Sequence, residues 1–183
     1  MLATKIYNFV KEDLKNFKGN YLEIGVFDGE GLAMLAKEYP DKNFWGIDPF
    51  IEDGNTTHIT GITKGGGLLS CKMKTKHNLS GLSNVLLIES TSKDTLFKAE
   101  YLQLTETSIQ YVFIDGDHSF EAATIDYRLA MKLIGDKSGA VVFDDVEECC
   151  PGVLRAAMNF QREFHDRICG HFLEGGFYIK AKQ

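Results

Sequence analysis

The sequence lacks an excess of basic residues and any long apolar run. Its 20 Lys and Arg residues are outnumbered by 26 Asp and Glu residues, which gives a formal net charge of −6 at pH 7. This balance argues against a nucleic-acid partner, because proteins that bind nucleic acids cluster Lys and Arg on one face. No apolar run approaches the ~20 residues that cross a bilayer, so we expect no membrane partner either.

Cysteines in metal-binding or redox spacing are also missing. The four cysteines are Cys71, Cys149, Cys150 and Cys169, and no two of them form a C-x-x-C pair. This spacing excludes a zinc ribbon and a thioredoxin motif. We expect the adjacent Cys149 and Cys150 to be reduced thiols. The first 17 residues are too charged for a secretory signal, so the expected location is cytoplasmic.

The length of 183 residues fits one domain, and we expect residues 1–183 to form a single unit. A chain of this size buries about 70% of the surface that its unfolded form exposes, which is enough for one sizeable core. There is no room for separate cofactor and substrate domains. An enzyme of this length must therefore build both sites on one scaffold.

Helical and strand patterns alternate along the chain. Ile6, Val10, Leu14 and Phe17 recur at helical spacing and predict an amphipathic helix within residues 1–18. Further helices are expected at Glu30–Glu38, Leu68–Leu79, Ser92–Leu102, around the apolar stripe Ala122, Ile125, Leu129 and Leu133, and from Pro151 with Val153, Ala157, Phe160 and Phe164 on one face. Strands are expected at Tyr21–Val26, Phe44–Ile47, Val85–Ile88, Ile109–Ile114, Gly139–Phe143, Arg167–Leu173 and Gly176–Ala181.

This alternation predicts an α/β protein with a doubly wound, Rossmann-like, seven-stranded sheet and helices on both faces. Most strands should run parallel. Only the turn Glu174-Gly175 separates the last two strands, and so short a connection cannot make a crossover. The C-terminal strand should therefore run antiparallel to its neighbour.

Acidic residues follow each of the first five predicted strands. In open parallel sheets, ligands bind outside the carboxyl ends of the strands, so these residues are the candidates for a functional site. They are Glu23, Asp48, Glu89, Asp115 with Asp117 and His118, and the pair Asp144-Asp145.

The turn after the first strand contains Gly25, Gly29 and Gly31, which allow a sharp bend and close approach of a ligand to the backbone. This spacing differs from the G-x-G-x-x-G fingerprint of dinucleotide binding. The acids around it would make a poor seat for a diphosphate but suit a cofactor with positive charge. At the second strand end, Asp48 can accept both hydroxyls of a ribose, or it can simply cap the turn before Pro49.

The acids after the fourth and fifth strands can converge, because these strands are neighbours in a doubly wound sheet. Asp115, Asp144 and Asp145 would offer oxygen ligands to a hard cation such as Mg²⁺. His118 lies three residues after Asp115 and could take a proton from a substrate hydroxyl. Separately, these residues are ordinary loop residues, and Asp117 or Ser119 is expected to cap the next helix.

The run YLEIGVFDGEG, the distal Asp48 and the segments VFIDGDHSFEA and VVFDD resemble class I S-adenosylmethionine-dependent methyltransferases. The resemblance extends from about Tyr21 to Lys180. The D-G-D-H-S-F-E segment with a later F-D-D is more specific and is similar to the metal-dependent branch, which includes sugar O-methyltransferases of macrolide pathways.

The resemblance implies a role for each matching residue. Glu23 would bind the amino group of the cofactor's methionine, directly or through water, and Asp48 would hold the ribose. Asp115 would be a catalytic residue, a contact of the cofactor and a metal ligand, and His118 would be the general base. The implied sets are Gly25, Gly29 and Gly31 along the cofactor, Glu89, Ser90 and Thr91 beside the adenine, and Asp115, Asp144 and Asp145 around a divalent metal, expected to be Mg²⁺.

The expected activity is methyl transfer to a hydroxyl of a small molecule or sugar. An NAD(P)-dependent oxidoreductase and a non-catalytic S-adenosylmethionine-binding module are the alternatives. The segment 50–83 does not fit a tidy β-α-β connection and is expected to cover the acceptor. The sequence leaves open the acceptor, the choice among Mg²⁺, Mn²⁺ and Ca²⁺, and the oligomeric state, with a homo-oligomer among the possibilities.

Overall fold

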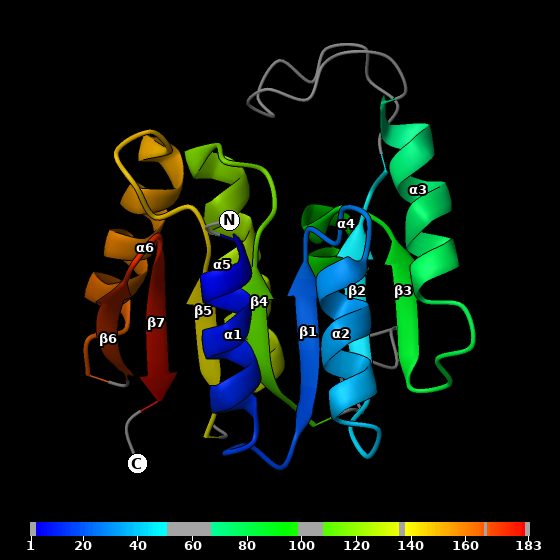
Figure 1. Ribbon diagram of the computed structural model, residues 1–183. Helices are drawn as coiled ribbons and strands as arrows, with labels where there is room; N and C mark the ends of the chain where they lie inside the picture. The colour runs from blue at the N-terminus through cyan, green and yellow to red at the C-terminus, as the bar shows by residue number, and fades with distance from the viewer. Residues whose placement is uncertain (1–2, 51–66, 99–107, 136–137, 167, 182–183) are drawn as a thin grey trace.

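The computed structural model describes residues 3–50, 67–98, 108–135, 138–166 and 168–181 (Figure 1). Seven strands form one sheet, with helices on both of its faces. The strands are β1 (Asn20–Ile24), β2 (Phe44–Asp48), β3 (Val85–Glu89), β4 (Ile109–Ile114), β5 (Ala140–Phe143), β6 (Ile168–Leu173) and β7 (Gly176–Ala181). The helices are α1 (Ala3–Leu14), α2 (Glu30–Glu38), α3 (Gly67–Asn78), α4 (Ser92–Lys98), α5 (Phe120–Ile134) and α6 (Pro151–Glu163).

The sheet order is β3-β2-β1-β4-β5-β7-β6. Strands β1 to β5 pair in parallel, and β7 pairs antiparallel with both β5 and β6. The predicted fold class is therefore confirmed, including the antiparallel C-terminal strand. The strand order reverses between β1 and β4, and this switch point is where ligands bind in open α/β sheets.

Helix α1 packs on the same face of the sheet as α2 (Figure 1). Its predicted stripe of Ile6, Val10, Leu14 and Phe17 is fully buried, as expected. Aromatic contacts extend this packing, since Tyr7 meets Phe113 of β4 edge-on with ring centroids 4.9 Å apart. The first turns of α1 lie near the edge where β1, β4 and β5 end (Figure 1).

Helices α4, α5 and α6 cover the opposite face. The predicted apolar stripe of α5 was partly wrong, because Ala122 and Ile125 are only half-buried. Asp126 and Tyr127 point into the protein instead, although both carry polar groups. Tyr127 stacks on Phe160 of α6 with centroids 4.8 Å apart, and its hydroxyl donates to Glu163 Oε2. The buried face of α5 therefore differs from the face that hydropathy alone predicts, because it includes polar side chains that have hydrogen-bond partners.

Several predicted boundaries shift by one or two residues. Strand β1 ends at Ile24 rather than Val26, because Gly25 adopts a φ of 89° and starts the turn. Helix α6 ends before Phe164, which forms its C-cap. The stretches 51–66 and 99–107, which include much of the predicted acceptor cover and the predicted end of the Ser92–Leu102 helix, lie outside the described residues. None of the described helices is both long and apolar enough to cross a bilayer.

Candidate active site

The carboxyl ends of β1, β4 and β5 lie side by side at the upper edge of the sheet in Figure 1. Backbone hydrogen bonds continue from the strands into the loops: Asp115 N–H donates to Ile24 O, and Asp144 N–H donates to Ile114 O. These bonds fix the loop starts relative to one another. The predicted site residues after these three strands are thus held on one rigid platform.

Gly25 and Gly29 both need the conformational freedom of glycine. Their φ angles are 89° and 75°, in the left-handed region that side chains disfavour. A Cβ at Gly25 would also lie 1.9 Å from Asp115 O, so this residue allows the turn to approach β4. At Gly31 the nearest group is the ring of Tyr7, 2.2 Å from an added Cβ. The space beside Gly31 is therefore occupied by α1.

Asp48 braces the glycine turn. One carboxylate oxygen accepts from Val26 N at 2.9 Å and from Phe27 N at 3.0 Å, and the other accepts from Phe50 N at 2.8 Å. These bonds hold the turn after β1 against the end of β2. The second oxygen, which accepts only from Phe50 N, has further acceptor capacity, so a ribose contact through it is compatible with this bracing and stays a prediction.

Glu23 is fully buried within β1. Tyr7 donates to its Oε1 and Tyr21 donates to its Oε2, both at 2.9 Å. Burial raises the pKa of Glu23 to about 8, although the two tyrosine hydrogen bonds act to lower it. In this conformation Glu23 offers no surface to a ligand, so its predicted contact with a cofactor amino group would run through an intermediate group.

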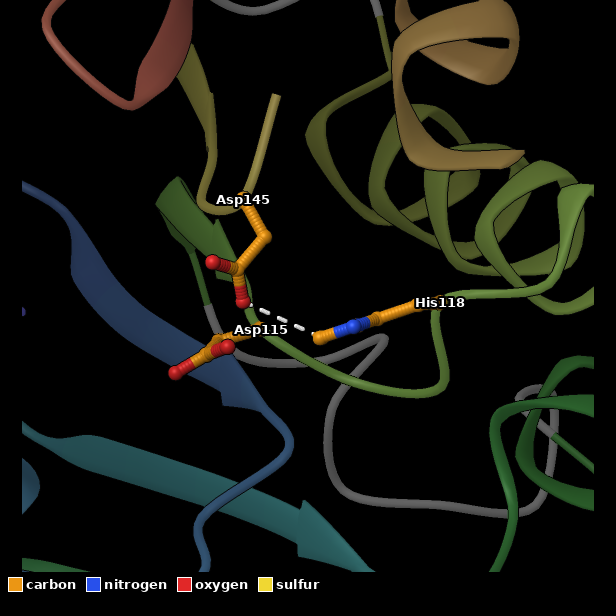
Figure 2. A group of neighbouring side chains, drawn as sticks. All are labelled: Asp115, His118 and Asp145. Carbon is orange, nitrogen blue, oxygen red and sulfur yellow. Dashed lines mark ion pairs between the residues drawn. The ribbon is translucent and has the colours of Figure 1, made fainter. Parts of the chain in front are cut away.

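Asp115, His118 and Asp145 converge beside the switch point (Figure 2). One ligand atom from each lies within 4.8 Å of the others. His118 Nε2 and Asp145 Oδ2 are 3.0 Å apart. Burial raises the pKa of Asp115, and the nearby charges of Asp144 and Asp145 raise it further. Such crowding of carboxylates is costly unless a positive charge offsets it.

Asp144, the third predicted metal ligand, is not part of this group of three, and its predicted role stays a prediction. Its Oδ1 accepts from Asp145 N–H at 2.9 Å, and Asp145 adopts a φ of 52°. The third member of the group is instead His118, from the loop after β4. Burial raises the pKa of Asp144 to about 6. Asp144 still lines a small cavity with Ile114, Asp115, Gly116, Asp117, His118, Ala123 and Val153.

Both ring nitrogens of His118 have polar neighbours. Nε2 faces Asp145, and Nδ1 lies 3.5 Å from Cys150 Sγ. The hydrogen bond with Asp145 raises the pKa of His118. Cys150 is a free thiol, and burial raises its pKa to about 12, so it acts as a neutral neighbour. To take a substrate proton at Nε2, His118 must exchange its bond with Asp145.

The residues predicted beside the adenine have structural partners. Glu89 pairs with Lys72 of α3. Thr91 lies just before α4, where its hydroxyl accepts from Asp94 N at 3.1 Å and donates to Asp94 Oδ2 at 2.9 Å. Ser119, one of the two expected capping residues, caps α5 by accepting from Ala122 N. The adenine contacts of Glu89, Ser90 and Thr91 stay predictions.

Three polar residues near the site were not predicted from the sequence: the half-buried Tyr7 and the buried Tyr21 and Asp126. Tyr7 and Tyr21 read as core aromatics within a helix and a strand, and nothing in their local spacing marks them as partners of Glu23. Asp126 is buried on α5, and its Oδ2 lies 3.0 Å from a Cβ added at Gly116. Burial raises its pKa to about 7. The sequence signal for Asp126 is its position one helical turn before the apolar Leu129 and Ala130.

The donor set fits a divalent cation. Carboxylate oxygens are common ligands of Mg²⁺, Ca²⁺ and Mn²⁺, and Asp115 and Asp145 already lie close enough to share an ion. A cation there would also relieve the repulsion that raises the pKa of Asp115. On this chemistry, Asp115 and Asp145 would hold the ion, with His118 adjacent.

The sheet order, the glycine turn after β1 and the acidic switch point define a Rossmann-like protein of the class I methyltransferase type. Comparison with known families agrees: residues 22–146 match the family described as "Methyltransferase domain". The chain therefore belongs to the methyltransferase domain family.

A relative is the uncharacterized protein R132 of Acanthamoeba polyphaga mimivirus, which is 32% identical over 140 residues. The match covers 76% of this chain and 55% of R132. The chain thus spans about half the length of the curated relative that it matches.

Solved structures share the fold at low sequence identity. A candidate caffeoyl-CoA O-methyltransferase from Staphylococcus aureus has a TM-score of 0.69 and 17% identity, with 97% of this chain and 83% of that chain covered. The calicheamicin methyltransferase CalS11 has a TM-score of 0.65 and 19% identity, covering 98% and 77%. MycE from the mycinamycin pathway, solved with Mg and SAH, has a TM-score of 0.59 and 16% identity, covering 100% and 48%.

Proposed function

We propose that the protein transfers the methyl group of S-adenosylmethionine to a hydroxyl of a small molecule or sugar, assisted by a divalent cation. The convergence of Asp115, His118 and Asp145 next to the glycine turn carries this proposal. Support also comes from the neighbours, since MycE was solved with Mg and SAH and CalS11 is described as a TDP-rhamnose 3'-O-methyltransferase.

In this scheme the protein's own groups bind, orient and accept a proton. Asp48 would bind the cofactor's ribose, and the glycine turn would line the side of the cofactor that faces the backbone. Asp115 and Asp145 would hold the cation. A bound divalent cation supplies Lewis-acid chemistry that makes a nearby hydroxyl more acidic. His118 would accept the hydroxyl proton at Nε2, after this nitrogen has released its bond with Asp145.

Orientation matters as much as acidity. Methyl transfer is an in-line displacement, so the acceptor oxygen must lie opposite the sulfonium leaving group. Because β1 and β4 are neighbours, a cofactor on the β1 turn and a hydroxyl beside Asp115 would meet at the switch point. The rigid backbone bonds from Asp115 to Ile24 and from Asp144 to Ile114 would preserve that alignment.

The first test is cofactor binding and activity. Calorimetry should show binding of S-adenosylhomocysteine, and a panel of sugar and phenolic acceptors should yield methylated product that depends on Mg²⁺ or Mn²⁺. Asp115→Asn and His118→Gln should each lower kcat by about 10²-fold or more, whereas the exposed Asp166→Asn should not. A folded protein that binds neither S-adenosylmethionine nor S-adenosylhomocysteine would refute the proposal.

The same experiment separates the alternatives. Membership of the methyltransferase family speaks against the oxidoreductase, and tighter binding of NAD than of S-adenosylhomocysteine would reverse that conclusion. A non-catalytic binding module has no use for Asp115, His118 and Asp145. If variants at these positions kept full activity on an identified acceptor, the cation and histidine steps would be wrong.

A further inference from the structure

Two tyrosine hydroxyls bind the two oxygens of the Glu23 carboxyl group. Tyr21 comes from the same strand, and Tyr7 comes from α1, 16 residues earlier in the chain. Glu23 exposes no surface, whereas Tyr7 is half-buried. Of the two tyrosines that donate hydrogen bonds to Glu23, Tyr7 is therefore the one that is partly exposed to solvent.

The fold keeps the Tyr7 ring in this place from two sides. On one side, the ring packs edge-on against Phe113 of β4, with centroids 4.9 Å apart. On the other side lies Gly31 at the start of α2, where a Cβ would be 2.2 to 2.5 Å from the ring and its hydroxyl. Glycine at position 31 thus leaves room for the Tyr7 ring, and helix α1 contacts the glycine turn through this ring.

We infer that Tyr7 is a positioning residue of the cofactor site: its hydroxyl holds the Glu23 carboxylate in place for the amino group of the cofactor's methionine. The inference rests on the proposed use of S-adenosylmethionine. It adds helix α1 to the cofactor site, although the sequence pattern predicted only an amphipathic helix there.

The physical reason is the cost of a buried carboxylate. A charged carboxylate away from water is stable only when both oxygens accept hydrogen bonds. Removing the Tyr7 hydroxyl would leave one oxygen unsatisfied, so the group would turn or take up a proton and lose its attraction for an ammonium. A phenol that donates to Glu23 can also accept an N–H. The Tyr7 oxygen or a bridging water could therefore link Glu23 to the cofactor.

The test compares two ligands on three proteins. S-adenosylhomocysteine carries the amino group, whereas 5′-methylthioadenosine keeps the adenosine and sulfur but lacks the amino acid. Tyr7→Phe removes the hydroxyl and keeps the ring. Calorimetry should show that Tyr7→Phe weakens S-adenosylhomocysteine about tenfold and changes methylthioadenosine affinity by less than about twofold.

Tyr39→Phe is the matched control, because the Tyr39 hydroxyl also tethers α1, through Lys11 O at 2.6 Å, without contacting Glu23. This variant should bind both ligands as the unmodified protein does. If Tyr7→Phe weakened both ligands equally, or neither, the inference would fail while the proposed function stood. If the unmodified protein bound neither ligand, the proposed function would fail first and the inference with it.

A Glu23→Gln background supplies a second readout. There the loss of the Tyr7 hydroxyl should cost much less affinity for S-adenosylhomocysteine than it does in the unmodified protein, because the two residues act through one contact. Additive losses in the double variant would show that Tyr7 acts independently of Glu23 and would overturn the inference.

Discussion

At the scale of single residues, Glu23 combines burial, charge and a predicted functional role. A carboxyl group with no exposed surface is held by two phenols, and burial outweighs their effect so that the pKa of Glu23 rises to about 8. Glu23 thus holds a proton more tightly than a free carboxyl group does, whereas an ammonium ligand would favour the charged form. Binding of a cofactor with a charged amino group should therefore be coupled to proton release.

The raised pKa of Glu23 also predicts a pH dependence of stability. The folded protein holds this proton more tightly than the unfolded chain does, so the stabilising contribution is complete below about pH 4.5 and is lost as the pH rises toward 8. Glu23→Gln has no such proton. Its melting temperature relative to the unmodified protein should therefore rise by at least about 2 °C between pH 5.5 and pH 8.5.

Thermal unfolding followed by circular dichroism at several pH values measures this difference. Glu121→Gln, which removes an exposed carboxyl group from the first turn of α5, serves as the control. Melting profiles of Glu23→Gln and the unmodified protein that stay parallel across this range would show that Glu23 does not hold its proton as described.

At the scale of elements, helix α3 supports the glycine turn. Thr75 Oγ1 donates to Phe27 O at 2.5 Å, and Asn78 Nδ2 donates to Asp28 O at 2.9 Å. Sequence reasoning placed this helix in a segment that covers the acceptor. The structure shows that its C-terminal half contacts the turn on which the cofactor is proposed to lie, so it contributes to that side of the site.

This contact predicts that Thr75→Val, which keeps the shape of the buried side chain but removes its hydroxyl, weakens S-adenosylhomocysteine about three- to tenfold by loosening the turn. Thr95→Val on α4 is the matched control. Its hydroxyl is buried and has no hydrogen-bond partner in the structure of the described residues. Equal affinity of both variants and the unmodified protein in calorimetry would contradict a bracing role for α3.

At the scale of the whole molecule, the candidate site residues lie on one sheet or directly beside it. Residues of β1, β4, β5 and α1 meet within one continuous edge, and the cores on the two faces of the sheet share the same strands. We therefore expect residues 1–183 to unfold as one cooperative unit, and a ligand at the switch point to stabilise all of it.

This expectation can be measured with near- and far-ultraviolet circular dichroism during heating. Both signals should report one transition, and S-adenosylhomocysteine at 100 times its Kd should raise its midpoint by about 5–10 °C, corresponding to about 2.7 kcal/mol. Two separate transitions, of which the ligand moves only one, would contradict the single-domain prediction.

Local patterns were sufficient to predict much of the fold and the region of the site. The spacing of Ile6, Val10 and Leu14 marks α1, and the two-residue turn before β7 requires an antiparallel pair. Acids at successive strand ends indicate the functional edge, because parallel strands bring their carboxyl ends together. Each of these signals can be identified from a short stretch of the chain.

Only the tertiary structure decides which of these groups meet. The neighbouring loops after β4 and β5 bring Asp145 to Asp115 and His118, and the docking of α1 brings Tyr7 to Glu23. These contacts join distant segments and depend on side-chain packing, which local periodicity does not encode. The sequence by itself thus determined an acidic methyltransferase scaffold with its functional edge. Packing between distant segments determined which carboxylates are buried, which are paired, and which helix lies beside Glu23.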